Sequence, residues 1–224
     1  ARYLVFKGYV AATVNYTLRN AASPGASVLQ MSQDIKQSVP AIQAHAARLG
    51  YPLDRMAIAG GSAGGTLALL YAYRDASTSP LPVRFVFQAV GPPSFQPEDW
   101  YGLAAEPSAA AALFSVMSGK PIAPEMVGSP AYQKAIKDIS PYMWVTKNAP
   151  PTLAAYGRFD KVVPIAAVRH LVDALKQNGV PYDYLEFPNS GHGLQNDDDM
   201  FELYLRKLDA YLGRYLAYPQ PEPR

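Results

Sequence analysis

The feature that most constrains the fold is a glycine-flanked serine between an apolar strand and an apolar helix. Residues 57–70 read AIAGGSAGGTLALL, and the block around Ser62 matches G-x-S-x-G in the strand–turn–helix context that this motif requires. A serine at the tip of so sharp a turn has strained backbone angles, so the positions two residues before and after it must be small. Gly60 and Gly64 meet that need. The block predicts that Ser62 is an exposed nucleophile.

Two simpler interpretations of this block compete with the nucleophile. One is a glycine-rich turn whose serine only caps the following helix. The other is a phosphate-binding loop, but no Lys stands where a P-loop has one, and G-x-G-x-x-G is absent. The sequence therefore disfavours the phosphate loop.

The size of the chain favours one domain, and its charge leaves a small neutral substrate open. The chain has 224 residues, of which 49% are hydrophobic, so it is long enough for one sizeable core and too short for two comfortable domains. We expect residues 1–224 to form a single domain. The net charge is +2 and no basic run occurs, which argues against binding to nucleic acid or anionic lipid.

The lack of cysteine and of a long apolar run excludes further kinds of site and further classes of protein. The chain has no cysteine, which excludes disulfides, thiol nucleophiles and Cys-ligated zinc. No apolar run reaches the roughly 18 residues of a membrane span. The chain begins at Ala1 without a signal-peptide pattern, so we expect no membrane partner and favour a cytoplasmic location.

The apolar pattern alternates strands with helices, which predicts an α/β fold with a mostly parallel sheet flanked by helices. Pro40 predicts a kink or a break in one long helix. Segment 91–150 interrupts the alternation with many prolines and short apolar stretches, and we expect it to form a cap of short helices. Residues 219–223 are expected to be a frayed tail. The expected strands are 9–16, 55–59, 83–90, 152–156 and 182–187, and the expected helices are 1–7, 28–49, 66–74, 165–177 and 198–216.

One of the three histidines is placed to act as a base. His45 and His170 lie in the middle of expected helices, where an exposed or partly packed ring is the ordinary outcome. His192 lies in a glycine-containing loop after the last expected strand, so its ring can reach over the carboxyl edge of the sheet. Because a serine is a weak nucleophile until a base takes its proton, His192 is the predicted base for Ser62.

The carboxylate that orients the base is expected between the serine and the histidine in the chain, since that is the order in folds with this serine turn. Asp160 fits, because it follows the strand at 152–156 and so lies at the same sheet edge. A solvated loop aspartate or a helix cap is the alternative for Asp160. The other aspartates do not compete: Asp34 lies on a helix before the serine, Asp99 in the cap, and residues 197–199 at a helix start, where the helix dipole explains them.

These motifs resemble those of α/β-hydrolase fold enzymes, most nearly the esterase/lipase branch related to hormone-sensitive lipase and bacterial acetyl esterases. Residues 60–65 are similar to that branch's G-[DG]-S-A-G-G block, and residues 8–16 are similar to its GY-strand-Y-R segment. Asp160 and His192 stand where its acid and base stand. The resemblance covers nearly the whole chain, and it implies a serine hydrolase that cleaves carboxylic esters of small substrates.

In the implied mechanism Ser62 attacks the ester carbonyl, His192 transfers the proton, and Asp160 orients His192. The backbone N–H of Ala63 is the expected oxyanion-hole donor, and neither a metal nor an organic cofactor is needed. Several residues of the cap are candidates for lining an acyl or alcohol pocket, although a core role suits each of them equally: Phe95, Trp100, Tyr101, Phe114, Met117, Tyr142 and Trp144.

The chain differs from the family's pattern in its N-terminal part. Asn15 stands where the branch usually has Asp, and the His-Gly-Gly block that supplies oxyanion-hole amides, with the strand that carries it, has no counterpart. Two alternatives to the esterase therefore stay open. One is a peptidase or acylaminoacyl hydrolase of the same fold, and the other is a non-catalytic, truncated domain that binds a ligand or a partner.

The strand without a counterpart lies, in the family's sheet, between the strands that match 9–16 and 55–59. A gap in the middle of a sheet would leave backbone donors and acceptors unpaired. We therefore expect one of three outcomes. The chain is a truncated version of a longer hydrolase, or strand 9–16 pairs directly with 55–59, or it pairs with a second chain in a homodimer across an exposed sheet edge.

Overall fold

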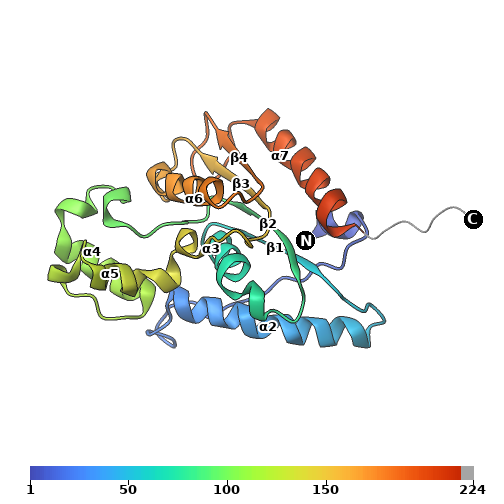
Figure 1. The fold of residues 1–224 in the computed structure, drawn as a ribbon, viewed down its shortest axis with the longest axis horizontal. Coiled ribbons are helices and arrows are strands. Elements are labelled where there is room, and N and C mark those ends of the chain that lie inside the picture. The colour runs from blue at the N-terminus through green and yellow to red at the C-terminus, as the bar shows by residue number, and fades with distance from the viewer. Residues whose placement is uncertain (218–224) are drawn as a thin grey trace, which may run out of the picture.

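The computed structural model describes residues 1–217 and has a parallel sheet at its centre (Figure 1). Each strand pairs in parallel with its neighbour, in the order β1-β2-β3-β4, so the predicted parallel sheet is confirmed. The tail expected at 219–223 lies outside the described residues. The strands are β1 (Met56–Gly61), β2 (Val83–Ala89), β3 (Thr152–Gly157) and β4 (Tyr182–Phe187).

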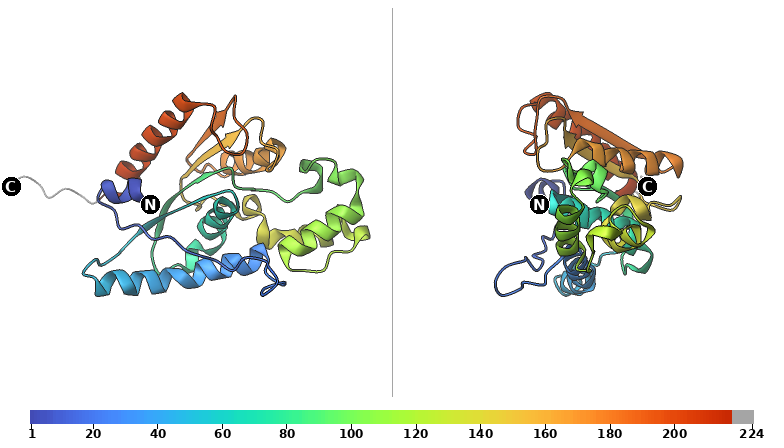
Figure 2. Two further views of the ribbon diagram at one scale, coloured as in Figure 1. Left: turned by 180° about the vertical axis from the view of Figure 1, so that it is seen from behind. Right: turned by 90° about the vertical axis from the view of Figure 1, so that its left-hand side faces the viewer.

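The helices that cover the sheet are α1 (Arg2–Phe6), α2 (Val28–Arg48), α3 (Ala63–Leu70), α6 (Ile165–Gln177) and α7 (Asp198–Tyr211). Neighbouring residues of a strand point to opposite faces of the sheet. Phe85 and Leu153 pack with α1 and α7, whereas Val86 packs with α3 and α6 on the other face. The ribbon shows these helices on the two sides of the sheet (Figure 2). Both faces of the central strands are therefore buried, which explains their nearly continuous apolar sequences.

Irregular turns extend two of these helices. α3 continues as a π-helical turn, Tyr71–Asp75, and a short 3₁₀ turn, Ala76–Thr78, while α7 continues as the π-helical turn Leu212–Leu216. The helices expected over 66–74 and 198–216 are therefore present with irregular last turns. Within residues 1–217, none of the helices combines the length and the apolar character needed to cross a bilayer.

Of the kink or break predicted at Pro40, the break does not occur, because α2 is continuous from Val28 to Arg48. Pro40 is exposed, and its missing N–H costs the helix one hydrogen bond. The helix compensates along its length, because Val39 and Ala46 are buried and the Ser27 hydroxyl caps the first turn by accepting from the N–H of Gln30 at 3.2 Å. A long helix with a cap and a buried face tolerates one such loss.

Residues 9–16 do not form the predicted strand. β1 pairs with β2 along one edge, and within residues 1–217 no strand pairs with its other edge, so the direct pairing of 9–16 with 55–59 is wrong. The β-branched and aromatic residues of 9–16 favour extended backbone, but composition cannot supply the hydrogen-bond partners that a strand needs. This segment instead borders a groove of about 790 Å³ against α2, with exposed Val10 and Tyr51 among its lining residues.

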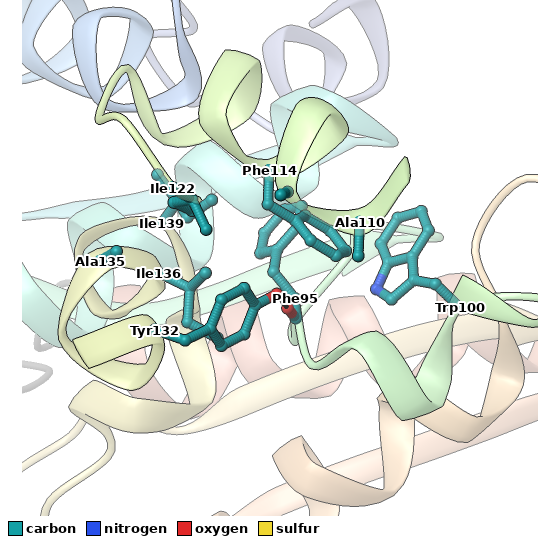
Figure 3. Packing of buried hydrophobic residues seen from close by; sticks show 10 residues of the cluster. Phe95, Trp100, Ala110, Phe114, Ile122, Tyr132, Ala135, Ile136 and Ile139 are labelled. Atoms are coloured by element: carbon teal, nitrogen blue, oxygen red, sulfur yellow. Dashed lines mark hydrogen bonds between the residues drawn. The ribbon is translucent and has the colours of Figure 1, made fainter. Parts of the chain in front are cut away.

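Between β2 and β3 the chain forms a block of short helices that lies beside the start of α2 (Figure 1). The block has a buried cluster of its own, in which Phe95 stacks on Trp100 with ring centroids 5.7 Å apart and Phe114 meets Tyr132 edge to face (Figure 3). Leu29 of α2 packs against this cluster. The helices of the block are Pro97–Asp99, Leu103–Ala105, α4 (Pro107–Ser118), Pro124–Met126, α5 (Pro130–Ile136), Lys137–Ile139 and Pro141–Trp144.

Candidate active site

Ser62 stands at the turn between β1 and α3 with φ 51° and ψ −126°. A non-glycine residue in such a conformation costs of order 1–3 kcal/mol, and it persists only where the surroundings fix it. Here the N–H of Ser62 donates to the carbonyl oxygen of Ala89 in β2 at 2.9 Å. The strand–turn–helix predicted for residues 57–70 is thus present, and it presents the hydroxyl of Ser62 at the carboxyl edge of the sheet.

The two glycines that flank Ser62 in the motif are not equally required. A Cβ at Gly60 would lie 2.0 Å from the carbonyl oxygen of Gly64, which is backbone and cannot turn away. A Cβ at Gly64 would meet nothing within 4 Å. The expected need for a small residue is therefore confirmed at Gly60 and wrong at Gly64.

His192 joins the other two predicted residues. Its Nε2 lies 2.9 Å from Oγ of Ser62, and its Nδ1 lies 2.8 Å from Oδ2 of Asp160. Ser62 follows β1, Asp160 follows β3, and His192 follows β4, so all three stand where parallel strands end at one edge of the sheet. The structure brings together the three residues that the sequence singled out.

The carboxylate of Asp160 is buried, and both of its oxygens make hydrogen bonds. Its side chain is 1% exposed, and Oδ1 accepts the N–H groups of Val162 and Val163 at 2.8 and 2.9 Å. Because a carboxylate only accepts hydrogen bonds, the proton between Asp160 and His192 belongs to Nδ1, and Nε2 is left to accept from the hydroxyl of Ser62. This is the tautomer that can take a proton from a serine.

The loops that carry Asp160 and His192 touch through their backbones. A Cβ at Gly157 would lie 2.2 Å from the carbonyl oxygen of Gly191, so only glycine allows the approach. The N–H of Phe159 donates to the carbonyl oxygen of Ser190 at 2.9 Å. These contacts fix the separation of the acid and the base.

Ala63 is the first residue of α3. An N–H at that position has no carbonyl one turn earlier in the helix to bond to, and the start of a helix carries partial positive charge. The backbone beside the Ser62 hydroxyl can therefore stabilise a negatively charged oxygen.

The histidines and aspartates that the sequence set aside lie outside this arrangement. His45 is exposed on α2 beside Arg48, and Asp34 accepts the N–H of Thr17. His170 of α6 lies 2.9 Å from Oδ2 of Asp99, and so joins α6 to the 91–150 block. The hydrogen bond to Asp99 raises the pKa of His170, although partial burial works against it.

Of the aromatic residues considered for a pocket, all but Tyr101 are bonded or packed within the 91–150 block. The hydroxyl of Tyr142 accepts from Nε2 of Gln96 at 2.6 Å, and Nε1 of Trp144 donates to the carbonyl oxygen of Lys137 at 2.7 Å. Phe95, Trp100 and Phe114 are buried in the cluster of the 91–150 block, with Met117 packed against them, so they have a core role. Tyr101 is instead exposed, and its hydroxyl donates to the carbonyl oxygen of Asp160 at 2.5 Å.

Comparison with known proteins links this geometry to ester hydrolysis. The sequence profile of the BD-FAE family matches residues 1–175. The chain is 29% identical over 200 residues to the probable carboxylic ester hydrolase LipM of Mycobacterium tuberculosis, a match that covers 85% of this chain and 43% of LipM. It is 28% identical over 220 residues to the acylamino-acid-releasing enzyme of Arabidopsis thaliana, covering 95% of this chain and 27% of that protein. The chain thus spans less than half the length of these curated relatives.

Among solved structures, a thermophilic esterase of Thermogutta terrifontis superimposes with a TM-score of 0.63 at 19% identity, covering 94% of this chain and 71% of that one. The same esterase is solved with propionate and with butyrate bound. At this identity the likeness shows the fold, which is the α/β-hydrolase fold that the sequence predicted.

Proposed function

Because the chain belongs to the BD-FAE family, we propose that it is a serine hydrolase that cleaves carboxylic esters of small substrates through an acyl-enzyme intermediate. The observation that carries the proposal is the hydrogen-bond chain from Ser62 through His192 to Asp160. The names of LipM, a probable carboxylic ester hydrolase, and of the Thermogutta terrifontis protein, an esterase, support it.

In the proposed reaction Oγ of Ser62 attacks the ester carbonyl while Nε2 of His192 accepts its proton. Asp160 remains a carboxylate, keeps the ring in the required tautomer and stabilises the imidazolium. The N–H of Ala63 donates to the oxyanion of the tetrahedral intermediate. His192 then returns the proton to the leaving alcohol, and a water molecule attacks the acyl group and regenerates Ser62.

The 91–150 block acts, in this proposal, as a cap within one domain that spans residues 1–224. Phe95, Trp100 and Phe114 fill the core of the block, so these side chains are not free to hold a fatty acyl tail. We therefore expect p-nitrophenyl acetate and butyrate to be hydrolysed faster than the palmitate ester. The propionate and butyrate complexes of the Thermogutta terrifontis esterase are in line with a short acyl group.

Reaction with a fluorophosphonate probe, read together with hydrolysis of p-nitrophenyl acetate, tests the proposal. The wild-type chain should be labelled and active, whereas Ser62→Ala and His192→Ala should lose both properties and keep a wild-type circular dichroism spectrum. A wild-type chain that is neither labelled nor active would favour the non-catalytic binding domain instead.

A peptidase or acylaminoacyl hydrolase is the second candidate, because the match to the acylamino-acid-releasing enzyme covers 95% of this chain. It would use the same three residues. The two candidates separate on substrates: a peptidase should cleave acylaminoacyl arylamides faster than p-nitrophenyl esters, and an esterase should show the opposite order.

The partner we propose, besides a small ester, is a second copy of the chain at the exposed edge of β1. On that edge β1 has no paired strand within residues 1–217, and apolar Val10, Leu49 and Tyr51 are exposed along the neighbouring groove. Light scattering after gel filtration should give twice the monomer mass for the wild type and the monomer mass for Val10→Lys. If the wild type were a monomer, the proposed homodimer would be wrong.

A further inference from the structure

The loop that carries His192 begins after β4 and ends at Asp197, directly before α7. Asp197 occupies the position that normally caps a helix, yet its side chain makes no capping hydrogen bond to α7. The residue is 8% exposed. A buried carboxylate at this position that does not cap its helix must have other partners.

The partners of Asp197 are the first residues of the same loop. Its Oδ2 accepts from the hydroxyl of Ser190 at 2.5 Å, and its Oδ1 accepts from Nδ2 of Asn189 at 2.8 Å. The N–H of Asn189 also points at this carboxylate, at 3.1 Å from Oδ2. The carboxylate thus ties the start of the loop to its end.

Ser190 extends this connection to the loop of the acid. It is fully buried, and its Oγ accepts the N–H of Asn196 at 3.0 Å. Its carbonyl oxygen accepts the N–H of Phe159, the residue before Asp160, at 2.9 Å. A shift of Ser190 would therefore move the base loop and the acid loop relative to each other.

The loop also stores backbone strain. Leu194 has φ 52°, and its N–H donates to the carbonyl oxygen of Gly191 at 3.2 Å. Such a conformation persists only where the surroundings fix it. The hydrogen bonds that close the loop at Asp197 are suited to that task.

We propose that Asp197 is a positioning residue: through Ser190 it holds the loop of His192 against the loop of Asp160, and so keeps Nε2 of His192 aimed at Ser62. The inference rests on the proposed function, because its effect is felt at the Ser62–His192 pair. Desolvation raises the pKa of Asp197, but the hydrogen bonds from Ser190 and Asn189 outweigh it and lower that pKa below its usual value. The group is therefore an anion at neutral pH, as its donors require.

The matched variants are Asp197→Asn and Asp198→Asn. Both remove one negative charge from the start of α7, but Asp198 is exposed in the first turn of the helix. The groups that bond to Asp197 are donors, so an amide there presents a donor to at least one of them. Because a displacement of about 1 Å can cost about 10²-fold in rate, Asp197→Asn should lower kcat on p-nitrophenyl acetate by roughly 10- to 100-fold, with KM nearly unchanged. Asp198→Asn should match the wild type.

The kcat-against-KM split, measured well below the unfolding temperature, separates positioning from plain stability. Ser190→Ala should lower kcat in the same way, and the double variant should be no slower than the slower single variant, because the two side chains act as one unit. Should Asp197→Asn not fold, Asn189→Ala removes one donor from an exposed side chain and should still lower kcat.

Failure of the positioning role can be distinguished from failure of the proposed function. If the wild type hydrolyses the ester and Asp197→Asn keeps the kcat of Asp198→Asn, the positioning role is wrong and the proposed function stands. If the wild type neither hydrolyses the ester nor reacts with the fluorophosphonate, the proposed function fails, and the inference fails with it.

Discussion

The hydroxyl of Tyr101 lies 2.5 Å from the main-chain oxygen of Asp160, so the 91–150 block is hydrogen-bonded to the loop of the proposed catalytic acid. Tyr101 is 61% exposed and makes this contact from the solvent side. The ion pair between Asp99 and His170 anchors the same stretch of the block to α6. These two contacts connect the block directly to the loop of Asp160 and to α6.

The first prediction is that Tyr101→Phe lowers kcat several-fold. The ring stays and only the hydroxyl is lost, so the free energy of unfolding should fall by about 1 kcal/mol or less. Tyr3→Phe is the matched control, because it also removes one hydroxyl bond, 2.7 Å long, to Asp209. We expect Tyr3→Phe to keep the wild-type kcat. A Tyr101→Phe protein as fast as the control would show that the contact does not support the acid.

The second prediction sets Gly60→Ala against Gly64→Ala. A Cβ at Gly60 overlaps backbone at 2.0 Å, and because neither group can rotate away, we expect a loss of about 3 kcal/mol in the free energy of unfolding, the upper end of the usual cost of overpacking. At Gly64, in the first turn of α3, a Cβ has open space, and alanine favours helix over glycine by up to about 1 kcal/mol. Thermal unfolding should therefore shift in opposite directions, or not shift at all for Gly64→Ala. Equal losses in both variants would contradict the steric explanation.

The third prediction concerns Asp160→Asn. The N–H groups of Val162 and Val163 require an acceptor, so the amide oxygen should replace Oδ1 and the amide nitrogen should face His192. That nitrogen is a donor, which forces Nδ1 of the ring to accept and leaves the proton on Nε2, the wrong tautomer for activating Ser62. The corresponding change in a serine protease triad costs about 10⁴ in kcat. Full activity in Asp160→Asn, with the fold retained, would place the acid elsewhere.

The sequence identified the catalytic candidates because their signals are local. Ser62 lies in a turn that only a few residue types allow, and the loops of Asp160 and His192 each follow a strand with a clear apolar pattern. The order serine, acid, histidine along the chain then indicated which aspartate belongs with Ser62 and His192. The bounds of β4 and α6 were also predicted correctly, because clear apolar patterns mark both elements.

Most of the errors have a different cause, since they depended on contacts that no local sequence pattern indicates. Residues 9–16 have strand composition but no neighbouring strand in the described part of the chain, and Pro40 lies in a helix that tertiary packing holds together. Asp197 was interpreted from the helix dipole alone, whereas its carboxylate is used by the preceding loop. The contact of Tyr101 with Asp160 depends on how the 91–150 block is placed, which no local pattern indicates.

The last prediction is a pH-dependent contribution of His170 to stability. The hydrogen bond to Asp99 raises the pKa of His170 in the folded state, and the charges of Glu98 and Asp173 add to it, while partial burial opposes it. An unfolded histidine has a pKa of about 6.5. The folded protein therefore binds this proton more tightly, so the stabilisation is complete below about pH 6.5 and is lost as the pH rises through the higher folded value.

Melting temperatures measured across this range give the test. The advantage of the wild type over His170→Asn should be larger at pH 6 than at pH 9, because the ion pair with Asp99 exists only while the ring is protonated. His45→Asn is the matched control, since His45 is an exposed helical histidine whose ring contacts Arg48 rather than a carboxylate. The wild type and the control should share one pH profile, from which His170→Asn departs on the acid side. If all three profiles ran parallel, the pair between Asp99 and His170 would not anchor the block through a charged ring, and the neutral hydrogen bond alone would have to hold it.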